Sequence, residues 1–178
     1  GMAVSKLYDF IWDDFCDWYI ELAKIRMNGA DEESADSARR VLVWTMSNTL
    51  KLLHPFMPYI TEEIWQTLPH DGEALIVAKW PEYDEALSFP QEAKNLENVM
   101  ALIRAIRTRR NEMNVPPSKK AHIYIDTAHP APYEEASEFI ARLAYGSKVE
   151  IGTGFDVQGA VTAVTDDAKA VSYTHLTL

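Results

Sequence analysis

The chain has 178 residues, of which 47% are hydrophobic and 25% are charged, and its net charge is −10. This composition is typical of a globular protein and excludes a disordered or fibrous chain. No apolar run reaches the roughly 18 residues of a membrane span, and the first residues lack the pattern of a secretory signal. Cys16 is the single cysteine, which excludes an internal disulfide and favours a reducing, cytoplasmic setting.

The negative charge is unevenly distributed along the sequence. Residues 102–120 hold six basic side chains against one acidic side chain, Glu112, so this segment has a local charge of +5. A polyanion would avoid most of the surface and be attracted to this part of it. The overall charge therefore does not exclude a nucleic-acid partner.

The first segment has the pattern of an amphipathic helix from Ser5 to about Met27. Apolar side chains recur at spacings of three and four residues, the helical period, at Leu7, Ile11, Phe15, Trp18, Leu22 and Ile25. This stripe is widened by Tyr8, Trp12, Cys16 and Tyr19. So broad an apolar face needs more than one neighbouring element to cover it.

A second helix is predicted from Asp31 to about His54, with acidic residues at its start where they suit the helix dipole. Pro55 ends this helix, because proline lacks an amide hydrogen and disfavours helix at the preceding residue. The inward side chains are expected to be Ala38, Val41, Leu42, Thr45, Met46, Thr49, Leu52 and Leu53.

A short third helix is predicted from Pro58 through Leu68, because proline is favoured in the first helical turn. Its inward side chains should be Ile60, Ile64, Leu68 and, beside them, Trp65. Residues 69–87 connect it to a fourth helix, which opens near Ser88 and ends before Pro116-Pro117. The apolar stripe of the fourth helix comprises Leu96, Val99, Met100, Ile103, Ile106, Arg110 and Met113.

Beyond the proline pair the pattern changes from helical to strand-like. β-branched and aromatic residues predict strands at residues 121–125, 148–151 and 159–165. Residues 131–145 between the first two strands read as a helix. The sequence therefore predicts a small β-α-β-β element after the helical part.

The predicted fold class is mainly α, with two parts and a tail. A helical bundle is expected over residues 1–115, followed by a small α/β junction element over residues 116–170. The tail, residues 171–178, is expected to be non-native or disordered. The boundary is placed at the proline pair, where the periodicity changes.

Groups that could carry catalysis are scarce. No two of the five histidines have helical spacing, and no Cys/His cluster has the spacing of metal ligands. Gly152-Thr153-Gly154 lacks the third glycine and the following helix of a phosphate-binding loop. Cys16 lies in an aromatic helix face and is better interpreted as a small buried thiol than as a nucleophile. The sequence predicts no catalytic residue and no metal site.

The basic segment at the end of the fourth helix is the best candidate for a binding site. Arginine side chains can grip phosphates bidentately, and the two lysines after the proline pair extend the positive patch. The predicted nucleic-acid-binding residues are Arg104, Arg107, Arg109, Arg110, Lys119 and Lys120. An alternative stays open, because cations in the last turn of a helix also stabilise the negative end of its dipole.

The five tryptophans also allow two interpretations. Exposed aromatic rings can stack on unpaired RNA bases. Aromatic residues at helical spacing, however, usually belong to the core. Base stacking and core packing therefore both remain possible for the five tryptophans, Trp12, Trp18, Trp44, Trp65 and Trp80.

Two longer stretches resemble a known family. FIWDDFCDWYIELAK (residues 10–24) and HPFMPYITEEIWQTL (residues 54–68) resemble the anticodon-binding region of class I aminoacyl-tRNA synthetases for branched aliphatic amino acids. The resemblance covers about residues 5–170 and is most similar to the valyl-tRNA synthetases. The valyl pattern is carried by Phe15-Cys16-Asp17-Trp18-Tyr19, His54-Pro55-Phe56-Met57-Pro58, Ile103-Arg104-x-Ile106-Arg107 and Asn114-Val115-Pro116-Pro117-x-Lys119.

The resemblance implies a helical bundle that binds the anticodon stem-loop of tRNA-Val, in a fragment of a cytoplasmic valine–tRNA ligase. In that family a separate catalytic domain uses ATP, and this chain has neither a His-x-Gly-His nor a Lys-Met-Ser-Lys-Ser signature. The chain alone is therefore expected to be inactive and to hold no cofactor. The equivalent module of an isoleucyl- or leucyl-tRNA synthetase, and a helical protein-interaction scaffold, remain alternatives.

The resemblance also predicts an incomplete bundle. Members of the family have additional helical sequence upstream, so the apolar face of the first helix should be exposed here. Self-association through that face is expected, because exposed apolar faces are often covered by oligomerisation. No membrane partner is expected.

Overall fold

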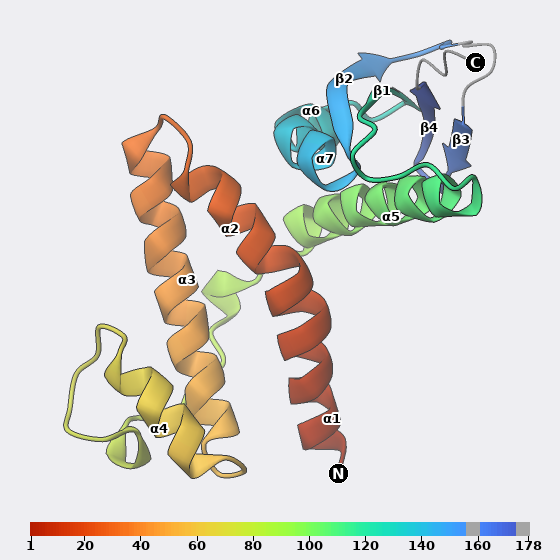
Figure 1. The fold of residues 1–178 in the computed structure, drawn as a ribbon. Coiled ribbons are helices and arrows are strands. Elements are labelled where there is room, and N and C mark those ends of the chain that lie inside the picture. The colour runs from red at the N-terminus through yellow and green to blue at the C-terminus, as the bar shows by residue number, and fades with distance from the viewer. Residues whose placement is uncertain (156–160, 174–178) are drawn as a thin grey trace. The chain divides into compact units, whose positions relative to one another are not determined.

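The computed structural model describes residues 1–155 and 161–173. The chain forms two compact units, residues 1–86 and residues 87–178, drawn in Figure 1. The first unit contains α1 (Met2–Asp9), a π-helix (Phe10–Tyr19), α2 (Ile20–Met27), α3 (Glu32–Leu53), α4 (Pro58–Gln66) and a 3₁₀ turn (Leu75–Val77). A second 3₁₀ turn, Glu85–Leu87, leads to α5 (Pro90–Glu112), β1 (Ala121–Thr127), α6 (Ala131–Glu135), α7 (Ser137–Leu143), β2 (Gly146–Gly152), β3 (Val161–Val164) and β4 (Ala168–Tyr173).

The first helical segment is continuous, as its periodicity predicts, but its middle is a π-helix. The amide of Ile20 donates to the carbonyl of Phe15, the longer hydrogen-bond spacing of this helix type. Phe15 and Trp18 are buried, whereas Tyr8 is 60% exposed and Trp12 is 53% exposed. The broad apolar face is thus covered only in part.

Local signals set the ends of α3 and α4. The Asp31 carboxylate caps α3 by accepting from the amides of Glu33 and Ser34, at 3.1 and 3.2 Å. The helix ends at Leu53, just before the proline, and Pro58 occupies the first turn of α4. Both helices therefore lie close to where the sequence predicts them.

One core cluster of the first unit lies between α3, α4 and the 3₁₀ turn at Leu75–Val77. Leu50, Trp65 and Leu75 are the buried centre. Met46, Ile64, Leu68 and Ala78 pack against this cluster. The Trp65 ring also stacks on the His70 ring, with centroids 3.7 Å apart.

The buried faces of α3 and α4 differ from the predicted ones at three positions. Val41 is 46% exposed and Ile60 is 48% exposed, whereas Thr61 is buried without having been predicted to be. Trp65 is buried, as predicted. Trp65 has a larger apolar surface than isoleucine, so turning it inward removes more apolar area from water. Thr61 is accommodated because its hydroxyl donates to the Met57 carbonyl at 2.8 Å.

The second unit is built on a four-stranded sheet of the described strands, in the order β2-β1-β4-β3. β1 is parallel to β2 and antiparallel to β4, and β3 is antiparallel to β4. Alternate residues of β1 are fully buried, namely Ala121, Ile123, Ile125 and Thr127. Within this unit α5 contacts β3, β4, α6 and α7, and α7 also contacts β2 (Figure 1).

The fold class is confirmed, because a helical part is joined to a small α/β element. The position of α5 differs from the prediction, which ended the helical bundle at residue 115. Its buried side chains, Val99, Leu102, Ile103 and Ile106, place α5 in the unit that contains the sheet, and the units divide between Ala86 and Leu87. The physical reason is that the apolar stripe of α5 covers one face of the sheet.

The end of the chain also differs from the prediction. The predicted tail began at residue 171, but residues 171–173 belong to β4, where Val171 and Ser172 are buried by pairing between β1 and β3. This strand was not predicted, so the element contains one strand more than the expected β-α-β-β. Residues 174–178, and residues 159 and 160 of the predicted third strand, lie outside the described residues.

Asp167 ties three parts of the second unit together. The Tyr133 hydroxyl donates to Asp167 Oδ2 at 2.8 Å, and His129 Nδ1 lies 3.0 Å from Oδ1. The Asp167 backbone carbonyl accepts from the Thr127 hydroxyl at 2.9 Å. The Tyr133 hydrogen bond holds the pKa of Asp167 below its usual value, and burial raises the pKa of Tyr133.

The lowered pKa of Asp167 predicts sensitivity to acid. Its contribution to stability is present above the unfolded-state pKa of about 4 and is lost as the pH falls through the lower folded-state pKa. Replacing Asp167 with asparagine should cost about 1–2 kcal/mol at pH 7 and remove this part of the acid dependence. Urea denaturation from pH 7 to pH 2 measures both, with Asp166→Asn as the exposed control. Parallel pH profiles for wild type and Asp167→Asn would contradict the assignment.

Candidate nucleic-acid interface

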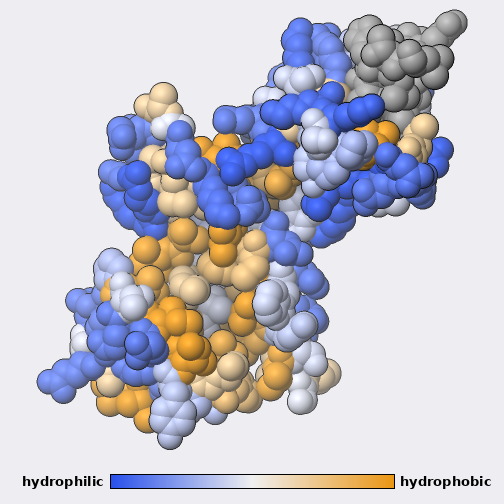
Figure 2. Space-filling view, viewed as in Figure 1, coloured by the Kyte–Doolittle hydropathy of each residue, from blue (hydrophilic) through white to orange (hydrophobic). Residues whose placement is uncertain are grey.

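Five of the six predicted phosphate ligands are exposed on the surface of the second unit. Arg104 and Arg107 are exposed on α5, and Lys119 and Lys120 are exposed in the loop between α5 and β1. Hydrophilic side chains dominate the visible face of α5 in Figure 2. These four residues, termed the α5 patch below, are accessible to a polyanion.

Arg109 contributes less positive charge than its sequence position indicates. Its Nη1 lies 2.7 Å from Glu112 Oε2, one helical turn along α5. Both side chains are more than half exposed, so the pair adds little stability. It does offset the charge of Arg109, which makes this residue a weaker candidate than Arg107.

The structure corrects the assignment of Arg110 as a phosphate ligand. Arg110 is only 2% exposed, and its Nη2 donates to the backbone carbonyls of Pro116, at 3.3 Å, and Lys119. Its guanidinium lies 5.7 Å from the centroid of the Tyr145 ring. Burial lowers the pKa of Arg110. Arg110 therefore belongs to the buried face of α5, where the helical spacing also placed it, and not to the phosphate-binding surface.

Arg110 instead shapes the loop that carries the two lysines. Asn114 has φ +55°, in the left-handed region, and reverses the chain direction after α5. The Val115 amide then donates to the Arg110 carbonyl at 2.9 Å, and the Arg110 side chain binds the loop carbonyls. The buried guanidinium therefore positions Lys119 and Lys120 rather than contacting a ligand.

If Arg110 has a structural role, its replacement should lower the stability of the second unit, whereas a phosphate ligand could be replaced without loss of stability. Arg110→Ala should lower the free energy of unfolding of the second unit by about 2–4 kcal/mol, because it leaves a cavity and loop carbonyls without donors. The exposed Arg107→Ala control should change it by no more than about 0.5 kcal/mol. Denaturant unfolding followed by circular dichroism measures both. Unchanged stability combined with weaker RNA binding would restore Arg110 as a ligand.

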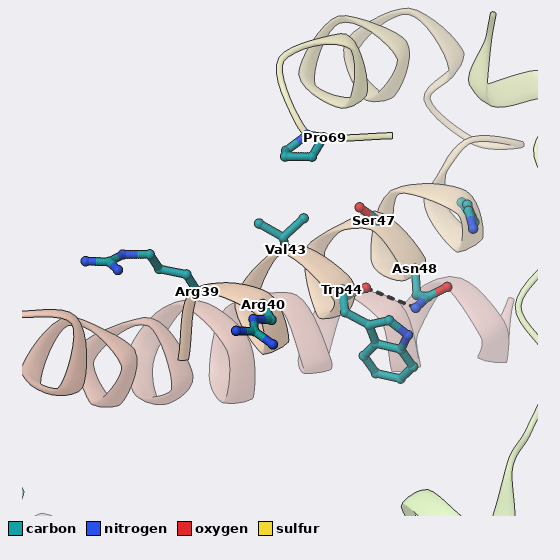
Figure 3. Close-up of a pocket in the computed structure, with 8 residues that line it drawn as sticks. Arg39, Arg40, Val43, Trp44, Ser47, Asn48 and Pro69 are labelled. Carbon is teal, nitrogen blue, oxygen red and sulfur yellow. Dashed lines mark hydrogen bonds between the residues drawn. The ribbon is translucent and has the colours of Figure 1, made fainter. Parts of the chain in front are cut away.

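A second cationic surface lies on α3 and was not singled out from the sequence. It is a depression of about 540 Å³, lined by Arg39, Arg40, Val43, Trp44, Ser47, Asn48, Lys51 and Pro69. Figure 3 shows Arg40 and Trp44 on one side of α3, with Val43 and Ser47 nearer Pro69. Trp44 is 55% exposed, so its ring is accessible.

The charges of this depression are not equivalent. Arg39 Nη1 lies 2.5 Å from Asp36 and 4.0 Å from Glu32, which offsets its charge. Among the residues that the structure describes, no carboxylate pairs with Arg40 or Lys51. Available positive charge therefore flanks the exposed indole.

A sequence signal for this surface was present. Arg40, Trp44 and Asn48 follow one another at intervals of four residues, and Lys51 follows three residues later. This spacing places all four side chains on one face of a helix. An apolar residue between cations on one helix face is atypical of a core stripe, and that contrast separates Trp44 from Trp65.

The described residues include neither a cluster of metal-ligating side chains nor a membrane-spanning helix. Within residues 1–155 and 161–173, no group of three or more His, Cys, Asp or Glu side chains could hold a metal ion. None of the described helices is both long enough and apolar enough to cross a membrane. Cys16 is partly buried on its helix.

Comparison with known proteins decides the family. Residues 2–125 match the family described as the anticodon-binding domain of tRNA ligase, and this match covers well over half of the chain. The chain belongs to the anticodon-binding domains of tRNA ligases. Both α3 and the whole of α5 lie inside the residues that match this family.

Among its relatives are valine–tRNA ligases of several bacteria. The enzyme of Bacillus licheniformis is 44% identical over 175 residues, which cover 96% of this chain and 20% of that protein. The enzyme of Staphylococcus aureus strain MRSA252 is 41% identical over the same length, and that of Listeria monocytogenes is 44% identical over 168 residues. The anticodon-binding chain thus spans about one fifth of the length of the curated relatives that it matches.

Proposed function

We propose that this chain is the anticodon-binding part of a valine–tRNA ligase and that it binds the anticodon stem-loop of tRNA-Val. The main support is the likeness to valine–tRNA ligases over 96% of the chain. The accessible cations support it independently, since an acidic chain of net charge −10 exposes Arg104, Arg107, Lys119 and Lys120 close together in sequence. Cations of this kind bind phosphates and orient an RNA.

The chain's part in the reaction would be positioning. Phosphate contacts by the α5 patch orient the stem-loop, and contacts to unpaired bases distinguish one anticodon from another. Placing the tRNA correctly at this end allows its 3′ end to be aligned elsewhere in a complete ligase. ATP and valine belong to that other part, in the cytoplasm, and the proposal assigns no cofactor to this chain.

The experiment that tests the proposal is a titration of the purified chain with tRNA-Val and with the same tRNA carrying a different anticodon. We expect tighter binding of the native anticodon. Equal binding of the two, or no binding, would contradict specific recognition. Titrations with tRNA-Ile and tRNA-Leu test an isoleucyl or leucyl module, and recovery of partners from RNase-treated lysate tests a protein-interaction scaffold.

Self-association remains a further part of the proposal. Tyr8 and Trp12 form an exposed aromatic pair with ring centroids 6.2 Å apart. Exposed apolar surface of this kind is often covered by a second copy. Sedimentation over a range of protein concentrations tests it, and a monomer at all concentrations would exclude it.

A further inference from the structure

We infer that the face of α3 formed by Arg40, Trp44 and Lys51 holds one unpaired base of the anticodon loop, stacked on the Trp44 indole. This inference rests on the proposed function and names a site for it. It concerns a surface of the first unit, whereas the α5 patch belongs to the second unit. The occupant is a single-stranded segment of RNA.

The accessibility of Trp44 is the first observation. Trp18 and Trp65 are buried at 6% and 2% exposure, but more than half of the Trp44 side chain is exposed. The ring borders a depression of about 540 Å³, which has room for a flat aromatic ligand. The Asn48 side-chain amide donates to the Trp44 carbonyl at 3.0 Å, drawn as a dashed line in Figure 3.

The charges around the indole identify the class of ligand. With a rise of about 1.5 Å per residue, Arg40 lies about 6 Å from Trp44 along the helix axis and Lys51 lies about 10 Å away on the opposite side. Because no described carboxylate pairs with these two cations, both can bind anions. A base stacked on the indole would have a cation near the phosphate on each side.

Stacking also explains why the ligand should be unpaired RNA. Every base offers an aromatic face, so a tryptophan binds any exposed base, and flanking cations follow the backbone. Bases inside a duplex are stacked on one another and do not expose this face. Trp44 is therefore expected to contribute affinity without selecting the identity of the base.

Two tryptophans provide a matched pair for the test. Trp44 and Trp80 are both 55% exposed, and both belong to the first unit. Trp44→Ala should weaken binding of a tRNA-Val transcript by about 5- to 150-fold, whereas Trp80→Ala should leave it unchanged. Trp44→Phe, which keeps an aromatic face, should recover most of the affinity. Circular dichroism checks that the variants fold.

A cation pair gives a second, independent control. Arg40→Gln should weaken binding and reduce the salt dependence by about one phosphate, while Arg39→Gln, whose charge is offset by Asp36, should do less. Transcripts that each lack one loop base can be titrated against wild type and Trp44→Ala. When the missing base is the one that stacks on Trp44, the two proteins should bind the transcript with equal affinity. That loss of additivity identifies the nucleotide.

The outcomes separate the inference from the proposed function. If wild type shows no tRNA binding, both are overturned. If wild type prefers the native anticodon and Trp44→Ala binds equally well, only the inference is overturned. A change in sedimentation of Trp44→Ala with unchanged RNA binding would assign this face to a second copy of the chain instead and overturn the inference.

Discussion

Replacing Trp65 with alanine is expected to lower the free energy of unfolding of the helical unit by about 3–5 kcal/mol. The ring is 2% exposed and lies at the centre of the cluster that joins α3, α4 and the following 3₁₀ turn, in contact with Leu50 and Leu75. Its removal leaves a cavity, because the side chains packed around the ring can relax only in part. The stacking contact with His70, at 3.7 Å, is lost as well.

This effect should reach the RNA site through α3. Leu50, which packs in the same core as Trp65, lies on the helix that carries Trp44, so a loosened core would disorder that helix before the rest of the chain unfolds. Urea denaturation followed by far-ultraviolet circular dichroism measures the change, with Trp80→Ala as control at about 0.5 kcal/mol or less. A loss under about 1 kcal/mol for Trp65→Ala would contradict the central position of this ring.

The affinity for tRNA is expected to fall steeply with salt. Each neutralised phosphate contributes roughly 0.7–0.9 to the slope of log K against log salt, because bound counterions are released. The four contacts of the α5 patch, Arg104, Arg107, Lys119 and Lys120, give a slope of about −3 by themselves. This part alone should lower the affinity about 50- to 150-fold between about 50 and 200 mM salt, and phosphate contacts by Arg40 and Lys51 would steepen the fall. Fluorescence anisotropy of labelled tRNA-Val measures this slope.

A double variant assigns the slope to α5. Arg104→Ala combined with Arg107→Ala should reduce the slope by about 1.4–1.8 and weaken binding of every tRNA alike, as phosphate ligands do. The matched control, Arg142→Ala with Lys169→Ala, removes the same charge from exposed positions outside α5 in the second unit and should change the slope little. Equal effects of the two double variants would show that only total charge matters, and that the α5 patch is not a site.

Several features of the fold are predictable because their causes are local. The carboxylate of Asp31 caps α3 from its own first turn, and the prolines at positions 55 and 58 act on adjacent residues, so helix ends agree closely with the sequence. The alternation of buried and half-buried residues in β1 likewise follows from strand geometry. The two family-like stretches are local in the same sense, as each lies within one helix and its turn.

The candidate site was predictable only in part. The positive segment at residues 102–120 is visible in the sequence, and five of its six cations are exposed. The structural role of Arg110 is not visible in the sequence, because its side chain binds the backbone carbonyls of a loop six and nine residues away. The cations at helical spacing around Trp44 distinguish it from Trp65 in the sequence, but only the structure shows that the Trp44 ring is exposed and the Trp65 ring is buried.

The sequence by itself determined the helices and most strands of the described residues, the accumulation of positive charge after residue 102, and the family of the chain. The tertiary structure decided that α5 supports a sheet, that Arg110 faces inward, and that Trp44 faces solvent between two cations. Helix ends and strand alternation depend on neighbours a few residues apart. Burial depends on contacts between elements distant in the sequence, and those contacts exist only after the chain has folded.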